Sequence, residues 1–147
     1  MLFRSHNVFD TAGKLILFYK NKMKQKAEEL FNVELKNPEF YNDPNDVSVY
    51  LACREPGYVT NIHSDNLSSN NEQNEKYGWS GHLSNLLYLN NDFNGGELYF
   101  PEHDLMIKPE PGMLVSFPGN IWHRHGILPA DKHRYAISIF FEIKDFI

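Results

Sequence analysis

The stretch that decides the fold is Ala136-Ile137-Ser138-Ile139-Phe140-Phe141, a short run of β-branched and aromatic residues near the end of the chain. Residues of these types favour β-strands. Four similar runs precede it, at residues 47–52, 86–89, 97–100 and 113–117, and turn signals rich in Asn, Gly and Pro separate them. Several short strands at this spacing predict a β-sandwich or β-barrel.

The N-terminal part of the chain has a different pattern. Between Thr11 and Phe31, apolar residues recur at helical spacing with lysines between them: Leu15, Tyr19, Met23, Ala27 and Leu30. This pattern predicts an amphipathic helix that packs its apolar stripe on the outside of the sheet. The turn-rich segment at residues 37–45 should end it.

Composition and charge exclude several classes of partner. The net charge of −5 and the sequence pI near 5.8 argue against nonspecific nucleic-acid binding, which needs a basic face. The lysines between Lys14 and Lys26 are better explained as a solvated helix face. The single Cys53 cannot form an internal disulfide, which fits a reducing compartment. With no signal peptide and no apolar run long enough for a bilayer, we expect a cytoplasmic protein without a membrane partner.

Candidate metal ligands begin with His63-Ser64-Asp65. On an extended strand, residues two apart point to the same face, so His63 and Asp65 can reach one ion together. Two histidines and one carboxylate form the ligand set that leaves half of an iron's coordination sphere open, although Mn, Co, Ni or Zn could also occupy it. Either His123 or His125 could supply the second imidazole, since both would share a face of one strand.

Arg134 follows these histidines and suggests a carboxylate co-substrate. Fe(II) brings two positive charges, Asp65 one negative charge, and a co-substrate such as 2-oxoglutarate two more. This assembly would keep one negative charge in a poorly hydrated cavity, which is costly. One buried guanidinium brings the sum to zero, and its planar fork suits a terminal carboxylate.

Together these residues resemble a known family. From about Val47 to Ile143 the chain resembles the iron(II)- and 2-oxoglutarate-dependent dioxygenases, and within them the prolyl 4-hydroxylase branch. The stretches that carry the resemblance are Pro56-Gly57, His63-Ser-Asp65, Leu87-Tyr88-Leu89-Asn90, Gly95-Gly96-Glu97-Leu98, Phe100-Pro101, His125-Gly-Ile-Leu-Pro129 and Arg134-Tyr135-Ala136-Ile137.

The resemblance decides between the two histidines. In this branch a proline follows the distal histidine by four positions and a basic residue follows by about nine or ten. His125 meets both conditions, with Pro129 and Arg134, and His123 does not. The resemblance therefore assigns His125 as the third ligand and leaves His123 as a neighbour. Nucleic-acid demethylases of the same superfamily place their arginine farther downstream.

The resemblance implies a fold and a set of cofactors. The expected fold is mainly β: a double-stranded β-helix (jelly roll) at about residues 46–144 in a single domain of residues 1–147, with an N-terminal helix at about residues 11–31 packed outside. Fe(II), 2-oxoglutarate and O2 are implied, and ascorbate is left open. Tyr88 would help Arg134 to hold the distal carboxylate of 2-oxoglutarate, and a core tyrosine with a satisfied hydroxyl is the alternative.

One position departs from the branch. A tyrosine usually stands three residues before the turn glycine Gly57, where this chain has Arg54. We expect Arg54 either to contact the substrate or to face solvent. The polar segment at residues 66–80 is expected to be a lid over the site or a plain loop.

The implied activity is hydroxylation of an unactivated C–H bond, with release of succinate and CO2. A prolyl residue in a peptide or protein is the first choice of substrate. One alternative is a free amino acid or small metabolite whose carboxylate Arg54 would bind. Another is a non-catalytic jelly-roll module that binds a metal.

Overall fold

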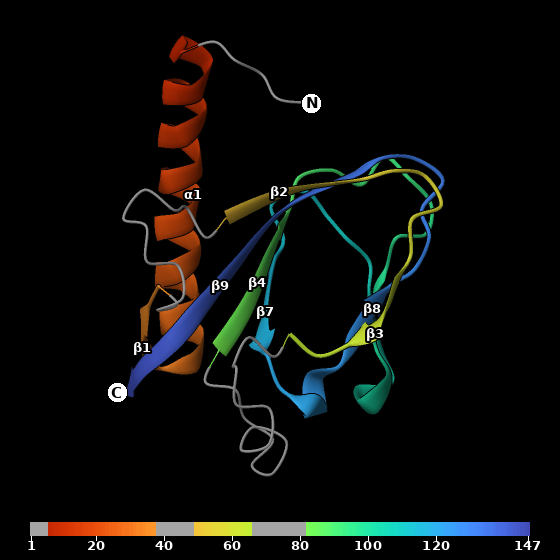
Figure 1. The fold of residues 1–147 in the computed structure, drawn as a ribbon. Coiled ribbons are helices and arrows are strands. Elements are labelled where there is room, and N and C mark those ends of the chain that lie inside the picture. The colour runs from red at the N-terminus through yellow and green to blue at the C-terminus, as the bar shows by residue number, and fades with distance from the viewer. Residues whose placement is uncertain (1–5, 38–48, 66–81) are drawn as a thin grey trace.

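The computed structural model describes residues 6–37, 49–65 and 82–147, which form one helix and two antiparallel sheets (Figure 1). The five-stranded sheet has the order β1-β9-β4-β7, and β2 also pairs with β9. The four-stranded sheet has the order β3-β8-β5-β6. Their bounds are β1 Val33–Lys36, β2 Val49–Arg54, β3 Thr60–His63, β4 His82–Tyr88, β5 Leu98–Phe100, β6 Leu105–Ile107, β7 Leu114–Pro118, β8 His125–Ile127 and β9 Arg134–Phe146.

The two sheets face each other, and helix α1 (His6–Phe31) covers the outer face of the five-stranded sheet (Figure 1). Short 3-10 turns precede β6 and β8, at Pro101–His103 (η1) and Ile121–His123 (η2). The predicted mainly β jelly roll with an external N-terminal helix is therefore confirmed. Within the described ranges, no helix combines the length and the apolar character needed to span a membrane.

Helix α1 differs from its prediction at both ends of its apolar stripe. Met23 and Ala27 are buried, but Leu15 and Leu30 are 54% and 70% exposed. The helix packs on the sheet through β1 and β4, so the ends of the stripe extend past the sheet. The expected solvated lysine face also includes one exception, because Lys20 is buried.

The bounds of α1 also need correction. The helix begins at His6, ahead of the predicted Thr11. It ends at Phe31 because Asn32 adopts a positive φ of 54°, and β1 follows at once. The turn signals at residues 37–45 therefore do not end the helix, and most of that segment lies outside the described residues. The expected lid at residues 66–80 lies outside them as well.

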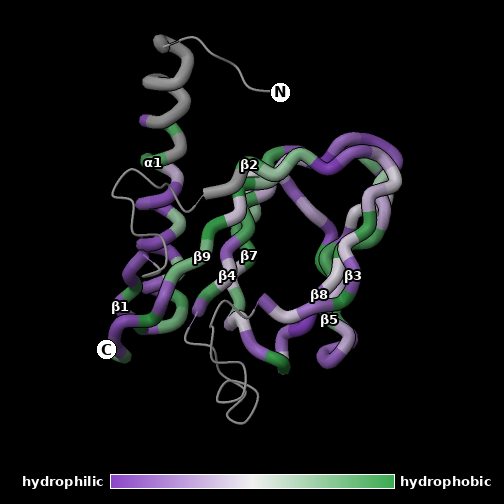
Figure 2. The backbone as a smooth tube through the Cα atoms, viewed as in Figure 1, coloured by the Kyte–Doolittle hydropathy of each residue, from purple (hydrophilic) through white to green (hydrophobic). Residues whose placement is uncertain are grey.

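The core forms on both faces of β9. Ile137, Ile139 and Phe141 point toward α1, where they pack with Met23 and Ala27 of the helix. The alternate residues of β9 face the four-stranded sheet, so this strand is covered on both sides and carries a nearly continuous apolar run. Figure 2 shows hydrophobic segments along β9 beside a helix whose visible turns are mostly hydrophilic.

A smaller apolar cluster joins the two sheets. It consists of Leu98 and Phe100 from β5 and Phe117 from β7, all buried. The rings of Phe100 and Phe117 meet edge to face with centroids 5.0 Å apart. This cluster closes one side of the space between the sheets and leaves the other side to the polar residues described next.

Candidate metal centre

Two histidines lie directly opposite each other at the paired edges of β3 and β8. His63 is the last residue of β3, His125 is the first of β8, and the two are register partners in the antiparallel ladder. Their ring centroids are 4.5 Å apart. Directly opposite residues in a ladder place their side chains on the same face, so both imidazoles point into the space between the sheets.

Gly126 allows β3 and β8 to approach this closely. A Cβ atom at this position would lie 2.8 Å from the carbonyl oxygen of Thr60 and 2.8 Å from Cδ1 of Ile62. Both distances are too short for real contacts, so any side chain here would push β3 away. The absence of a side chain at Gly126 therefore sets the separation of His63 and His125.

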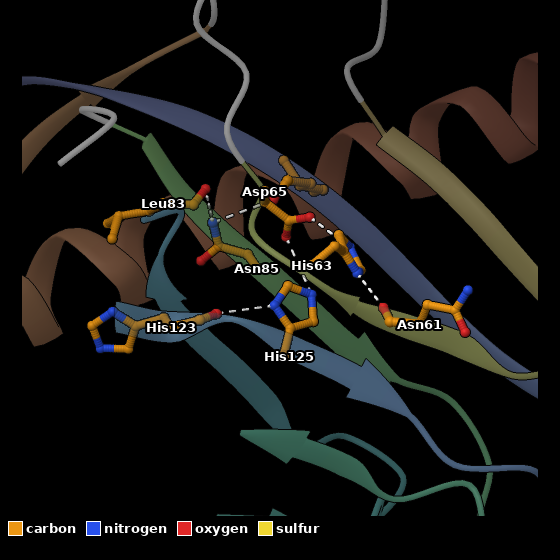
Figure 3. A network of polar contacts seen from close by, with 8 residues as sticks. Asn61, His63, Asp65, Leu83, Asn85, His123 and His125 are labelled. Atoms are coloured by element: carbon orange, nitrogen blue, oxygen red, sulfur yellow. Dashed lines mark hydrogen bonds and ion pairs between the residues drawn. The ribbon is translucent and has the colours of Figure 1, made fainter. Parts of the chain in front are cut away.

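Asp65 completes the cluster from just beyond the end of β3. Its Oδ1 lies 3.2 Å from Nε2 of His63, and its Oδ2 lies 3.5 Å from Nε2 of His125. One ligand atom from each of the three residues lies within 4.8 Å of the others. Figure 3 shows the three side chains pointing toward one another. The structure thus brings together the three residues that the sequence predicted as metal ligands.

Backbone carbonyls fix how the two imidazoles present themselves. Nδ1 of His63 lies 2.8 Å from the carbonyl oxygen of Asn61, and Nδ1 of His125 lies 3.1 Å from that of His123 (Figure 3). A carbonyl oxygen only accepts hydrogen bonds, so each Nδ1 carries the proton and donates it. In the neutral form of each ring, Nε2 then keeps a lone pair directed at the cluster, as a metal ligand requires, and a metal that binds there takes the place of a proton on Nε2. The donor set therefore fits a divalent transition metal.

The electrostatics of the cluster favour a cation. Burial raises the pKa of Asp65, but the hydrogen bonds with His63 and Ser84 and the attraction of the adjacent histidines in their protonated forms outweigh it, so the pKa lies below its ordinary value. Burial lowers the pKa of His125, which keeps that ring neutral. The hydrogen bond to Asp65 raises the pKa of His63. The carboxylate is thus ionised and its negative potential stabilises positive charge at this point.

His123 does not share a strand face with His125, contrary to the sequence prediction. It ends the 3-10 turn η2, while His125 begins β8. Its Nδ1 lies 2.7 Å from Oδ1 of Asn120, and its ring stacks obliquely on that of His103. His123 contributes its backbone carbonyl to His125 and directs its side chain away from the cluster (Figure 3).

Arg134 and Tyr88 form a second polar group on the facing sheet. Arg134 is the first residue of β9, Tyr88 is the last of β4, and they are 3% and 0% exposed. The guanidinium carbon lies 5.5 Å from the centroid of the phenol ring. Burial raises the pKa of Tyr88 and lowers that of Arg134.

Both side chains keep unused hydrogen-bonding atoms. Nη1 of Arg134 and the hydroxyl of Tyr88 are buried and make no hydrogen bond of normal geometry with the described residues, although the two side chains lie close enough for each to moderate the other's pKa. A buried donor without a hydrogen-bond partner lowers the stability of the folded protein, and the loss is larger for a charged guanidinium than for a neutral group. Alternate residues of a strand share a face, so Arg134 lies on the same face of β9 as Ser138 and Phe140. These two residues line the cavity beside the metal ligands. Such a group is ready to accept an anion such as a carboxylate.

A cavity of about 540 Å³ connects the cluster with β2 and β9. The three candidate ligands line it, and so does Arg54. The guanidinium carbon of Arg54 lies 4.6 Å from the ring centroid of Tyr58, and its Nε is buried. The structure therefore places Arg54 in the wall of the candidate site, which excludes an arginine directed only at solvent.

The sequence analysis did not identify three residues of this region: Thr60 and Ser84, which line the cavity, and Tyr58, which contacts Arg54. Thr60 and Ser84 line the cavity with buried hydroxyls: that of Thr60 lacks a partner in the described part of the chain, and that of Ser84 lies close enough to Asp65 to lower the pKa of its carboxyl. Tyr58 supports Arg54 from the turn before β3. The period of two along β4, where Ser84, Leu86 and Tyr88 share a face, was the signal that could have identified Ser84.

Comparisons with known proteins agree with this geometry. The family model described as the 2OG-Fe(II) oxygenase superfamily matches residues 46–142. Prolyl 3-hydroxylase 2 of Homo sapiens is 35% identical over 94 residues, which cover 56% of this chain and 13% of that protein. Prolyl 3-hydroxylase 3 of Homo sapiens is 38% identical over 56 residues, which cover 35% of this chain and 8% of that protein. The chain thus spans a small part of the length of these curated relatives.

A solved structure shares the fold. The viral collagen prolyl hydroxylase vCPH from Paramecium Bursaria Chlorella virus-1, in its 2OG complex, superposes with a TM-score of 0.56 at 18% sequence identity. The superposition covers 97% of this chain and 76% of that one. The superposed part includes nearly the whole chain, so the two proteins share the fold of an external helix and a jelly roll.

Proposed function

This chain belongs to the 2OG-Fe(II) oxygenase superfamily, and from that premise we propose that it hydroxylates an unactivated C–H bond of a prolyl residue in a peptide or protein. The reaction would consume 2-oxoglutarate and O2 and release succinate and CO2. One observation carries the proposal: His63, Asp65 and His125 converge on one point, and the buried Arg134 lies on the facing sheet.

Three side chains would hold the iron. The Nε2 atoms of His63 and His125 and the carboxylate of Asp65 supply the two imidazoles and one carboxylate that leave positions open for other ligands. When bound, iron supplies the activation of O2, a reaction that no side chain of this cluster can perform. The contacts of both histidines with backbone carbonyls orient the ligands before the metal arrives.

Arg134 and Tyr88 would bind and orient 2-oxoglutarate. The unpartnered Nη1 and hydroxyl can both donate to its distal carboxylate, and the planar guanidinium fixes the direction of approach. The closely packed sheet behind them excludes water from this carboxylate. A buried salt bridge of this kind is favourable only when its hydrogen bonds are made, so the site should select a co-substrate of matching length.

The prolyl substrate is supported by the relatives, both of which are named as prolyl hydroxylases. Those names specify the 3-position of the ring, whereas the resemblance in the sequence is to the 4-hydroxylase branch. We therefore propose prolyl hydroxylation without assigning the ring carbon, and the product analysis below distinguishes the two positions.

The proposal is tested by coupled assays on the purified chain. Fe(II), 2-oxoglutarate and a panel of proline-containing peptides should give succinate together with a mass gain of one oxygen atom on the peptide. Fragmentation and comparison with 3- and 4-hydroxyproline standards locate the hydroxyl. The Asp65→Ala variant serves as the matched control. Metal binding without any decarboxylation of 2-oxoglutarate would identify a non-catalytic module and overturn the proposal.

A further inference from the structure

We infer that Arg54 is a specificity-determining residue and that the substrate of this site carries a carboxylate, which Arg54 binds. The inference rests on the proposed function, because it assumes that Arg134 is committed to the co-substrate. It adds a substrate class: a prolyl compound with a free carboxylate close to the ring.

The position of Arg54 in the sheet is the first observation. Arg54 is the last residue of β2, and its register partner across the ladder is Arg134, the first residue of β9. Like charges directly opposite each other in a ladder are destabilising. Burial lowers the pKa of Arg134, and the charge of Arg54 acts in the same direction. Two guanidinium groups on paired positions of β2 and β9 repel each other, and more than one bound negative charge would be needed to neutralise both.

The partners of the arginines are the second observation. Arg124, on the surface, forms an ion pair with Glu102, and its Nε donates a hydrogen bond of 2.6 Å to that carboxylate. Neither Arg54 nor Arg134 has an ion pair with a carboxylate in the described ranges of the chain. Arg54 instead has its guanidinium against the ring of Tyr58, and its buried Nε has no hydrogen-bond partner there. Arg54 is thus held against an aromatic ring while the hydrogen-bonding capacity of its buried Nε stays unused.

The charge of the loaded site is the third observation. Asp65 is the carboxylate among the residues that line the cavity. Fe(II), Asp65, Arg134 and doubly negative 2-oxoglutarate sum to zero. Arg54 then adds one positive charge that neither the metal nor the co-substrate balances. Its Nε is buried and lacks a hydrogen-bond partner among the described residues, so a further anion that accepts this hydrogen bond would bind favourably.

The depth of the two arginines indicates which molecule brings this anion. Arg134 is almost fully buried behind the cavity, where the co-substrate carboxylate belongs. Arg54 lines the cavity itself and is only partly buried. A substrate that enters the cavity can therefore reach Arg54, whereas Arg134 lies behind it.

Two kinds of prolyl compound share the required chemistry. In one, the carboxylate is the α-carboxylate of free proline or of a C-terminal prolyl residue. In the other, it is the side chain of an acidic residue beside the proline. The experiment therefore uses free L-proline and pairs of peptides that differ only by a carboxylate: C-terminal acid against C-terminal amide, and Asp against Asn beside the proline.

Binding is measured without turnover, under nitrogen, on the full chain loaded with Fe(II) and 2-oxoglutarate. Calorimetric titration should show that the wild type binds the carboxylate member of at least one pair tenfold to about a hundredfold more tightly, as expected for a hydrogen bond to a charged group. Arg54→Gln should abolish this preference, and Arg54→Lys should retain part of it. The dissociation constant of 2-oxoglutarate should stay unchanged in both variants. Lys132→Gln removes an exposed charge and should leave every constant unchanged.

Three outcomes would overturn the inference. The first is equal binding of acid and amide in every pair by the wild type. The second is weaker binding of 2-oxoglutarate, and not of the substrate, in Arg54→Gln, which would make Arg54 a co-substrate residue. The third is an unchanged acid preference in that variant. The proposed function fails separately, if no prolyl compound is hydroxylated aerobically while the carboxylate preference in binding persists.

Discussion

The two halves of the site are built on unequal supports. The candidate metal ligands lie on or beside β3 and β8, strands of four and three residues, in a sheet whose outer side chains Ile62 and Met106 are 44% and 59% exposed. Arg134 and Tyr88, the proposed carboxylate-binding pair, lie on β9 and β4, strands of thirteen and seven residues, with a buried core and α1 behind them. The metal half therefore depends on contacts among its own polar groups and on the small apolar cluster against which His125 packs, whereas the Arg134 half depends on the packing of the whole sheet.

The strongest test of this comparison removes the anionic ligand. Asp65→Ala should abolish iron-dependent succinate formation, because the two histidines alone lack the negative charge that retains a divalent cation. The fold should remain, since the supporting core lies on the other sheet. Succinate release and thermal unfolding measure the two effects. Retained turnover would remove Asp65 from the ligand set.

A smaller effect is expected on the opposite half. Arg134→Ala should raise the concentration of 2-oxoglutarate needed for half-maximal turnover about tenfold to a hundredfold, as for the loss of a charged hydrogen bond. The affinity for the metal should stay the same, because Arg134 lies on the other sheet. Arg134→Lys keeps the charge without the planar fork and should give an intermediate value. If Arg134→Ala leaves the 2-oxoglutarate requirement unchanged, another residue anchors the co-substrate.

Tyr88→Phe separates the two interpretations of this tyrosine. If the hydroxyl binds the co-substrate, its loss should raise the 2-oxoglutarate requirement several-fold, from a hydrogen bond of about 1 kcal/mol. The stability of the protein should be equal or higher, because the variant removes a buried hydroxyl that lacks a partner in the described residues. A core tyrosine with a satisfied hydroxyl would give the reverse result: an unchanged 2-oxoglutarate requirement and a lower stability, because the hydrogen bond of the hydroxyl is lost.

The smallest effect concerns the loop that joins the two halves. Asp131, between β8 and β9, accepts hydrogen bonds from the backbone nitrogen and the side-chain amide of Asn94, and both donor–acceptor distances are 2.7 Å. These bonds lower the pKa of Asp131 below its ordinary value. A carboxyl with a lowered pKa in the folded state contributes stability above its unfolded pKa, about 4, and loses it as the pH falls through the folded pKa.

Asp131→Asn should therefore reduce stability at neutral pH and have little effect in acid. The free energies of unfolding of the variant and the wild type, measured by urea titration from neutral to acidic pH, should converge as the pH falls. Asp104→Asn is a matched change at another exposed aspartate. A difference between Asp131→Asn and the wild type that stays constant with pH would show that charge is not the cause.

The same comparison explains what could be predicted from the sequence. The long, doubly covered strand β9 and the middle of α1 were evident because their patterns extend over many residues. Strands β6 and β8 have three residues each and were missed, and His123 was wrongly placed on a strand with His125. Strand β5 is equally short but was predicted, because the turn residues Gly95 and Gly96 set off its apolar run. Leu15 and Leu30 have the helical spacing of core residues, but spacing cannot show where a helix leaves its sheet.

The candidate site divides in a similar way. His63 and Asp65 are close in sequence, so local geometry was enough to group them. Arg134 and Tyr88 meet only through the pairing of β4 with β9, and their grouping came from the family resemblance. The cross-strand pair of Arg54 and Arg134 was not predicted, because it depends on the exact register of β2 against β9.

The contact at Gly126 has a consequence for how this protein can change over evolutionary time. The spacing of the two imidazoles depends there on the lack of a side chain, which lets Gly126 lie against the Thr60 carbonyl oxygen and the Ile62 side chain of β3. Mutations that accumulate on the outer surface, or in the wall formed by β2, can therefore alter what the protein recognises without displacing the ion's ligands. Gly126 thus maintains the spacing of the two imidazoles while other residues of the pocket change.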